Sequence, residues 1–122
     1  MLSRLAKMYL RLKQHDSALE IAERLVLLAE RQHGGNHPNM IPYVEQVAEV
    51  RAARGEPGET EAAVERSLKL RERKYGAASD ELMEALEHFG NLMHESQLAN
   101  LGNDYFERAS NIRDRNSHAL FV

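Results

Sequence analysis

Apolar residues recur at steps of three and four along most of this chain, the spacing that places side chains on one face of an α-helix. One such stripe comprises Leu2, Leu5, Ala6, Tyr9 and Leu12, and a second comprises Ala18, Ile21, Ala22, Leu25, Leu28 and Ala29. No stretch alternates apolar and polar residues for long, so no strand is expected. The pattern therefore predicts an all-α fold.

Glycine and proline cluster at residues 34–38, 55–58 and 76–79, and strong helix formers fill the segments between them. These boundaries predict helices over about residues 2–13, 16–33, 39–54, 59–75, 80–95 and 98–114. Asp16 or Ser17 is expected to cap the second helix, with Ser17 and Glu20 forming a capping box. Pro42 is expected in the first turn of the third helix, where its missing N–H does no harm.

The chain also matches itself at a shift of 42 residues, without any gap. The pair Glu23-Arg24 meets Glu65-Arg66 and then Glu107-Arg108. Other matched sets are Leu5, Val47 and Phe89; Ala6, Ala48 and Gly90; Ala22, Val64 and Phe106; and Leu28, Leu70 and Ile112. Small residues return where two helices must approach closely, and large ones return where space must be filled. The period predicts stacked helix pairs that share a continuous core.

The motif Leu5-Ala6-x-x-Tyr9, followed by Ala18 and then Ala22 to Leu25, resembles the tetratricopeptide signature of small and large positions. The period of 42 residues and the segment from Ala63 to Gly76 are similar to kinesin-light-chain-type repeats. The resemblance implies one domain over residues 1–115, with repeats at about 1–36, 37–78 and 79–115, and a tail at 116–122. It also implies a right-handed α-solenoid of about three antiparallel helix hairpins, in which the first helices line a concave groove for a peptide or helix of a partner protein.

The resemblance places a set of polar side chains in that groove: Lys7, Arg11, Glu45, Glu49, Glu84, Glu87, Asn91, His94 and Glu95. Acidic residues dominate this set in the second and third repeats. We therefore expect a partner segment that carries Lys or Arg. The alternative interpretation is that these residues form an ordinary solvated helix face.

Composition narrows the function further. A net charge of −3 argues against nucleic-acid binding, and no apolar run approaches the length of a membrane span. The chain has no cysteine, which suits a reducing compartment, so we expect a cytoplasmic protein. His33 and His37 have a metal-ligand spacing, but Gly34 and Gly35 separate them and predict ordinary loop histidines. No phosphate-binding loop or nucleophile motif is present. We therefore expect that the protein binds no cofactor and no metal and is not an enzyme.

The two ends of the chain leave a second function open. The sequence finishes with Ala119-Leu120-Phe121-Val122, a short apolar patch after a polar leader. The chain could be a fragment of a longer solenoid, its tail could fold back as a cap, or its ends could dock on other copies. The alternative to a partner-binding scaffold is thus a self-assembling repeat fragment that forms a homo-oligomer.

Overall fold

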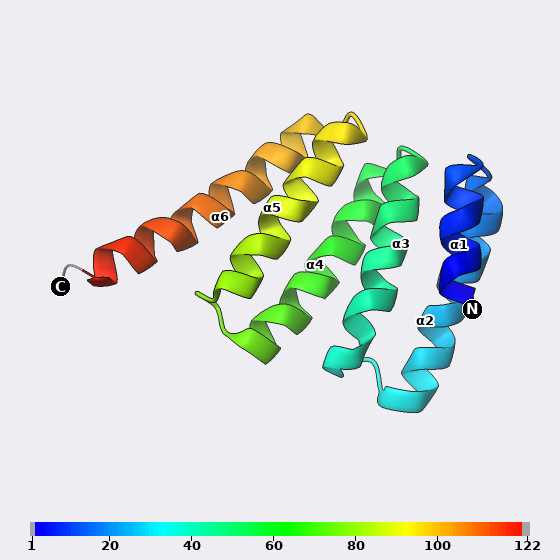
Figure 1. Cartoon of the computed structure of the whole chain (residues 1–122), viewed down its shortest axis with the longest axis horizontal. Coiled ribbons are helices and arrows are strands. Elements are labelled where there is room, and N and C mark those ends of the chain that lie inside the picture. The colour runs from blue at the N-terminus through cyan, green and yellow to red at the C-terminus, as the bar shows by residue number, and fades with distance from the viewer. Residues whose placement is uncertain (1, 121–122) are drawn as a thin grey trace.

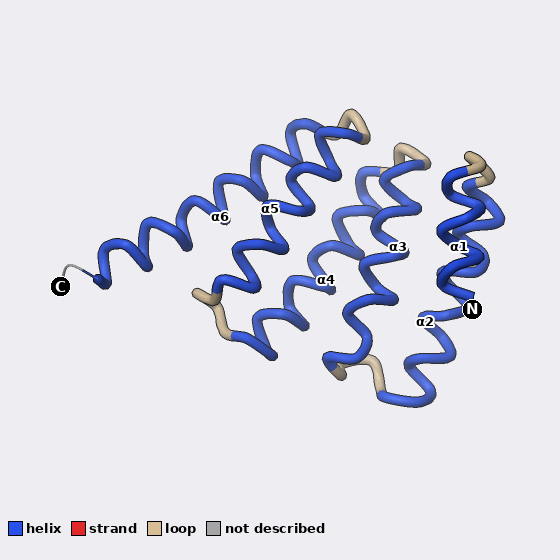
Figure 2. The backbone as a smooth tube through the Cα atoms, in the orientation of Figure 1, coloured by secondary structure: helices blue, strands red, loops and turns tan. Residues whose placement is uncertain are grey.

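The computed structural model describes the backbone of residues 2–120 and the side chains of residues 4–116. Over this part of the chain it contains six α-helices and one 3-10 helix, and no strand, so the all-α prediction is confirmed. The elements are α1 (Leu2–Arg11), α2 (His15–His33), η1 (Pro38–Met40), α3 (Ile41–Ala53), α4 (Pro57–Tyr75), α5 (Asp80–Glu95) and α6 (Ala99–Leu120) (Figure 2). The predicted places of Leu2 in an apolar stripe and of residues 119–122 in an apolar patch lie outside the described side chains.

The helices form three pairs, α1 with α2, α3 with α4 and α5 with α6. Neighbouring pairs touch through α2 with α3 and through α4 with α5. Figure 1 shows the pairs side by side in chain order, with α1 and α2 at the right and α5 and α6 at the left. The middle pair therefore has a neighbour on each side.

The turns inside the three pairs have the same geometry at the same spacing. Lys13, Gly55 and Gln97, each 42 residues apart, have positive φ angles of 59°, 73° and 64°. The backbone N–H of the next residue donates to a carbonyl five residues earlier in each turn: Gln14 to Tyr9, Glu56 to Arg51, and Leu98 to Met93. The sequence period thus corresponds to a recurring backbone conformation.

Only one of these three left-handed positions is glycine, so two carry strain. A non-glycine residue in this region costs about 1–2 kcal/mol, partly offset by the flexibility that glycine adds to the unfolded chain. We expect Lys13→Gly and Gln97→Gly each to stabilise the protein by about 0.5–1 kcal/mol. Together they should raise the Tm by a few degrees in thermal unfolding. The converse change, Gly55→Lys, should lower it, and a Tm that falls in the double variant contradicts the argument.

The loops between pairs also correspond. Gly34 and Gly76 follow α2 and α4 with φ angles of 88° and 103°, and each donates its N–H to the carbonyl four residues earlier. After each loop a side chain caps the next segment: His37 Nδ1 accepts from Asn39 N, and Ser79 Oγ accepts from Leu82 N. Pro42 lies in the first turn of α3, as predicted.

Three of the local predictions are wrong. α2 begins at His15 after Gln14, with no side-chain cap, so neither Asp16 nor Ser17 caps it and the capping box with Glu20 does not form. α6 continues to Leu120 instead of ending near residue 114. No glycine or proline occurs between residues 114 and 120 to end the helix. Asn116 Nδ2 also donates to the carbonyl of Ala78 at 3.1 Å, which holds α6 against the loop that precedes α5.

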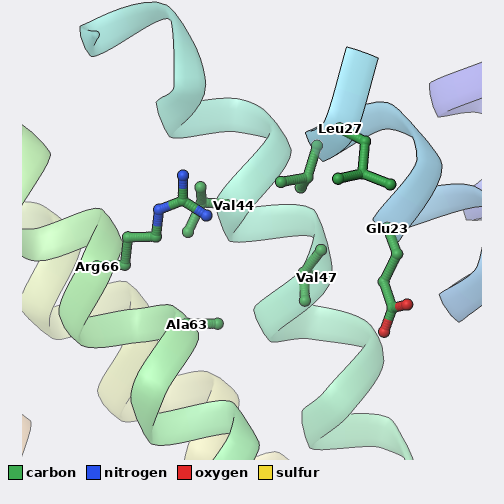
Figure 3. Close-up of a pocket in the computed structure, with 7 residues that line it drawn as sticks. Glu23, Leu27, Val44, Val47, Ala63 and Arg66 are labelled. Carbon is green, nitrogen blue, oxygen red and sulfur yellow. The ribbon is translucent and has the colours of Figure 1, made fainter. Parts of the chain in front are cut away.

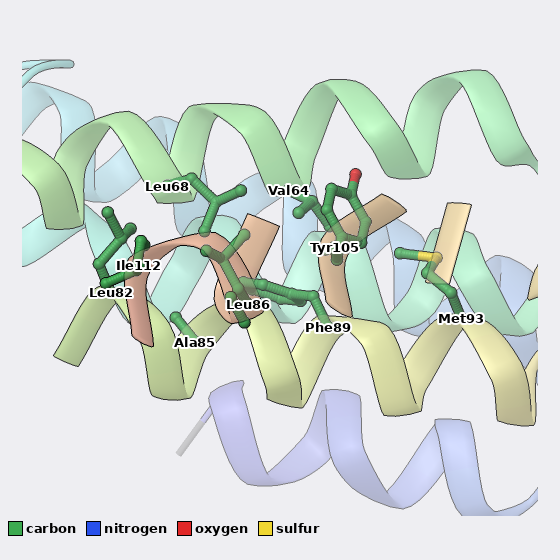
Figure 4. Close-up of a cluster of buried hydrophobic side chains, with 11 residues drawn as sticks. Val64, Leu68, Leu82, Ala85, Leu86, Phe89, Met93, Tyr105 and Ile112 are labelled. Atoms are coloured by element: carbon green, nitrogen blue, oxygen red, sulfur yellow. The ribbon is translucent and has the colours of Figure 1, made fainter. Parts of the chain in front are cut away.

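The largest buried cluster lies between α4, α5 and α6 (Figure 4). Its members include Val64, Leu68, Leu82, Ala85, Leu86, Phe89, Met93, Tyr105, Ala109 and Ile112. The Phe89 and Tyr105 side chains are almost completely buried, at 0% and 1% exposure. Smaller clusters join α2 to α3, one around Met40 and Ile41 and the other around Ala18, Ala22 and Val50. The junction between the second and third pairs is thus filled by large side chains.

Tyr105 belongs to this core because of its ring. Its hydroxyl is buried without a hydrogen-bond partner among the described residues, and burial raises its pKa above the ordinary value. The Arg108 guanidinium lies 5.7 Å from the centre of the ring. The ring therefore fills space between helices and is covered by a cation on one face.

Candidate functional site

Glu49, half-buried on α3, connects the charges of three helices. Its pKa is raised mainly because burial disfavours the carboxylate, and nearby Glu45 adds to this rise. His88 of α5 and Lys7 of α1 act in the opposite direction. One carboxylate is thus within electrostatic range of both neighbouring first helices. Of the predicted set, Lys7 and Glu45 lie within electrostatic range of Glu49, as does His88, which the predicted set omitted although it follows Glu87 directly.

Glu45 is already paired within the fold. Its carboxylate accepts from Arg71 Nε at 2.6 Å and Nη2 at 2.9 Å, and from the buried Ser67 hydroxyl at 2.6 Å. Hydrogen bonding to Glu45 raises the pKa of Arg71. The contact ties α3 to α4. A partner would have to compete with Arg71 for this carboxylate.

Glu84 and Glu87 of α5 differ in whether an arginine of the fold pairs with them. Glu87 accepts from Arg113 Nη2 of α6, so its charge is balanced inside the third pair. Glu84 is exposed and acts on Arg71 only at longer range. Of these four glutamates of α3 and α5, Glu45 and Glu87 are therefore paired with arginines. Glu49 and Glu84 form no ion pair in the described part of the chain.

The remaining predicted residues are Arg11, Asn91, His94 and Glu95. Arg11, Asn91 and Glu95 are exposed, as is Lys7. His94 is directed toward α6, where its Nε2 lies 3.0 Å from Asn103 Oδ1 and its ring packs 5.4 Å from that of Phe106. Its contacts are therefore within the third pair.

Glutamate and arginine side chains link successive second helices. Arg108 of α6 donates to Glu65 of α4 at 2.5 Å. Arg66, its counterpart 42 residues earlier, donates to Glu30 of α2 at 2.8 Å, while Glu23 pairs with Arg51 at 2.9 Å. Glutamate–arginine links are thus present at both junctions between helix pairs, but the junction of the first and second pairs uses different partners. These half-exposed pairs contribute about 0–1 kcal/mol each.

An apolar pocket of about 280 Å³ lies between α2, α3 and α4 (Figure 3). Its lining residues are Glu23, Val26, Leu27, Val44, Val47, Ala63 and Arg66. This pocket was not predicted from the sequence. The sequence does carry an indication of it: Val47 and Ala63 have smaller side chains than Phe89 and Tyr105, the residues 42 positions later.

The first pair leaves large apolar side chains uncovered. Met8 is 53% and Leu28 is 48% exposed, whereas Val50 and Leu70, 42 residues later, are buried. Val50 is buried because it packs against Ala18 and Ala22 of the preceding pair. Met8 has the same place on α1 without a preceding pair in the described chain.

The histidine pair near the first loop forms a local structural contact. The rings of His33 and His37 stack with their centroids 5.4 Å apart, and Asn39 bonds to His37. Across the described residues, no three His, Cys, Asp or Glu side chains gather as a metal-binding group.

No protein-family model matches this sequence, and no curated protein matches it either. In the part of the chain that the structure describes, no helix has the length and apolar character needed to cross a membrane.

Proposed function

We propose that this chain is a short right-handed α-solenoid of tetratricopeptide type, and that it binds a segment of a partner protein along a concave groove formed by α1, α3 and α5. Two features support the solenoid: the turn conformation that recurs at residues 13, 55 and 97, and the chain-order stacking of three helix pairs. Stacked units with one repeated geometry produce an extended binding surface.

The observation that carries the binding role is the position of Glu49. Its electrostatic interactions with Lys7 and His88, together with the direct contact between α3 and α5, support a surface shared by polar side chains of α1, α3 and α5. A carboxylate that burial destabilises gains more from a new positive charge than a fully solvated one does. Glu49 and the exposed Glu84 therefore favour a partner segment that carries Lys or Arg.

A short fluorescent peptide of alternating Arg and Ala tests this preference by fluorescence anisotropy. We expect it to bind more tightly than the matching Glu–Ala peptide. Glu49→Lys combined with Glu84→Lys should weaken binding at least about tenfold, because two attractions become two repulsions. Glu45 is left unchanged in this design, since its reversal would leave Arg71 facing another cation. Affinity should also fall as the pH is lowered, because the raised pKa of Glu49 means that its carboxylate takes up a proton at a higher pH than an ordinary glutamate does.

The matched control reverses two exposed charges on α4, Glu59→Lys with Glu61→Lys, and changes the net charge equally. This control should bind the Arg–Ala peptide nearly as well as the original chain. Tighter binding of the Glu–Ala peptide, or an equal loss in the control, would show that the surface does not select cations.

A second candidate function is self-assembly through the first helix pair. The exposure of Met8 and Leu28 favours it, because the equivalent side chains of the second pair are buried by a neighbour. Light scattering on the same samples separates the candidates. The groove variants should leave the oligomeric state unchanged if copies meet through α1 and α2.

A further inference from the structure

The pocket between α2, α3 and α4 is the counterpart of a filled space elsewhere in the protein. At the junction of the second and third pairs, the positions 42 residues later are Leu68, Leu86, Phe89 and Tyr105, and all four are buried. At the first junction these positions hold Val26, Val44, Val47 and Ala63, each with a smaller side chain. The pocket is therefore the volume that two aromatic rings and two larger aliphatic side chains occupy in the next unit.

The entrance to the pocket also differs between the two junctions. The Glu65–Arg108 pair spans the second junction, with Arg108 over the ring of Tyr105. At the first junction Glu23 and Arg66 are directed apart, toward Arg51 and Glu30 respectively (Figure 3). No bridge between these two residues closes the pocket, and a guanidinium stands at its rim.

We infer that this pocket binds an aromatic side chain, Phe or Tyr, presented by a partner protein. The ring takes the place that Tyr105 has in the following unit, and Arg66 takes the place of Arg108 beside its face. The lining from Val26, Val44, Val47 and Ala63 is apolar, which suits a ring better than a charged group. Its volume of about 280 Å³ exceeds the roughly 150 Å³ of an apolar cavity that holds benzene.

This site is separate from the proposed groove. Val44 and Val47 are three residues apart and share one face of α3, while Glu45 and Glu49 lie on a nearly opposite face. An aromatic side chain can thus bind whether or not the groove binds a cationic segment. The two proposals can fail independently.

The first test titrates p-cresol, the side-chain analogue of tyrosine, into methyl-labelled protein and follows the NMR spectrum. We expect saturable shifts at the methyl groups of Val44, Val47 and Ala63. Ala63→Tyr supplies the residue found at position 105 and should reduce the shifts at Val44 and Val47 at least tenfold at a given concentration. Ala62→Tyr adds the same ring at a neighbouring exposed position and should keep them. Val47→Phe, which supplies the residue found at position 89, fills the pocket by a second route if Ala63→Tyr does not fold.

The second test selects random displayed peptides on the original chain. Peptides enriched in Phe or Tyr that bind Ala63→Tyr at least tenfold more weakly support the inference. It is overturned if p-cresol shifts other methyl groups only, or if the filled variants bind p-cresol or the selected peptides as well as the original chain. The variant with Glu49→Lys and Glu84→Lys should still bind p-cresol, which separates this outcome from a failure of the groove.

Discussion

Replacing Phe89 by alanine is expected to lower the free energy of unfolding by about 3–5 kcal/mol. The side chain is 0% exposed and lies in the cluster that joins α4, α5 and α6, between residues of all three helices (Figure 4). Its removal loses the transfer free energy of a buried ring and leaves a cavity that rigid helices cannot close. Small domains are stable by about 5–15 kcal/mol, so the loss is a large fraction of the total. Chemical denaturation followed by circular dichroism measures it.

The matched control is Val47→Ala, 42 residues earlier. Val47 is only partly buried and lines the open pocket, so its truncation should cost about 1 kcal/mol. The difference between the two variants tests whether the two junctions are packed as differently as the structure indicates. Equal losses at positions 47 and 89 would mean that the first junction is as tightly filled as the second.

The sequence predicted the helices because their signals are local. Apolar spacing and the breakers near residues 34, 55 and 76 placed five of the six helices within about three residues of their ends. The turns were harder to predict, because only Gly55 marks a left-handed conformation that Lys13 and Gln97 also adopt. The positive φ angle at these turns thus follows the position in the 42-residue period and not the type of residue. The N-terminus of α2 has no side-chain cap, so the short polar residues beside it were misleading.

The candidate site was less predictable, because it depends on how helices turn toward one another. The sequence placed Glu45 and Glu87 among a row of acidic residues, but could not show that Arg71 and Arg113 neutralise them from neighbouring helices. Glu49, by contrast, forms no ion pair with an arginine among the described residues, so its charge is not neutralised in this way. The pocket could have been found by comparing side-chain volumes between junctions, since Ala63 and Tyr105 share one place in the period.

A close approach of α5 and α6 at two glycines gives the other large effect. Gly90 and Gly102 face each other there, and a Cβ atom added at Gly102 would lie 2.8 Å from the carbonyl oxygen of Gly90. The ring of His94, which lies closer still to the same point, could rotate away, but the backbone carbonyl could not. The equivalent places on α2 and α4 hold Ala18 and Thr60, so only the third pair has this requirement for glycine.

We therefore expect Gly102→Ala to destabilise the protein by about 2 kcal/mol, although alanine is the better helix former by about 1 kcal/mol. Gly102→Thr, which copies position 60, should cost about 3 kcal/mol because the helices must separate further. Gly58→Ala on α4 is the matched control, since a Cβ atom there meets nothing within 4 Å. It should leave stability unchanged or raise it slightly. If Gly102→Ala stabilises the chain as Gly58→Ala does, propensity outweighs packing at this crossing, and α5 and α6 are not held as closely as their glycines require.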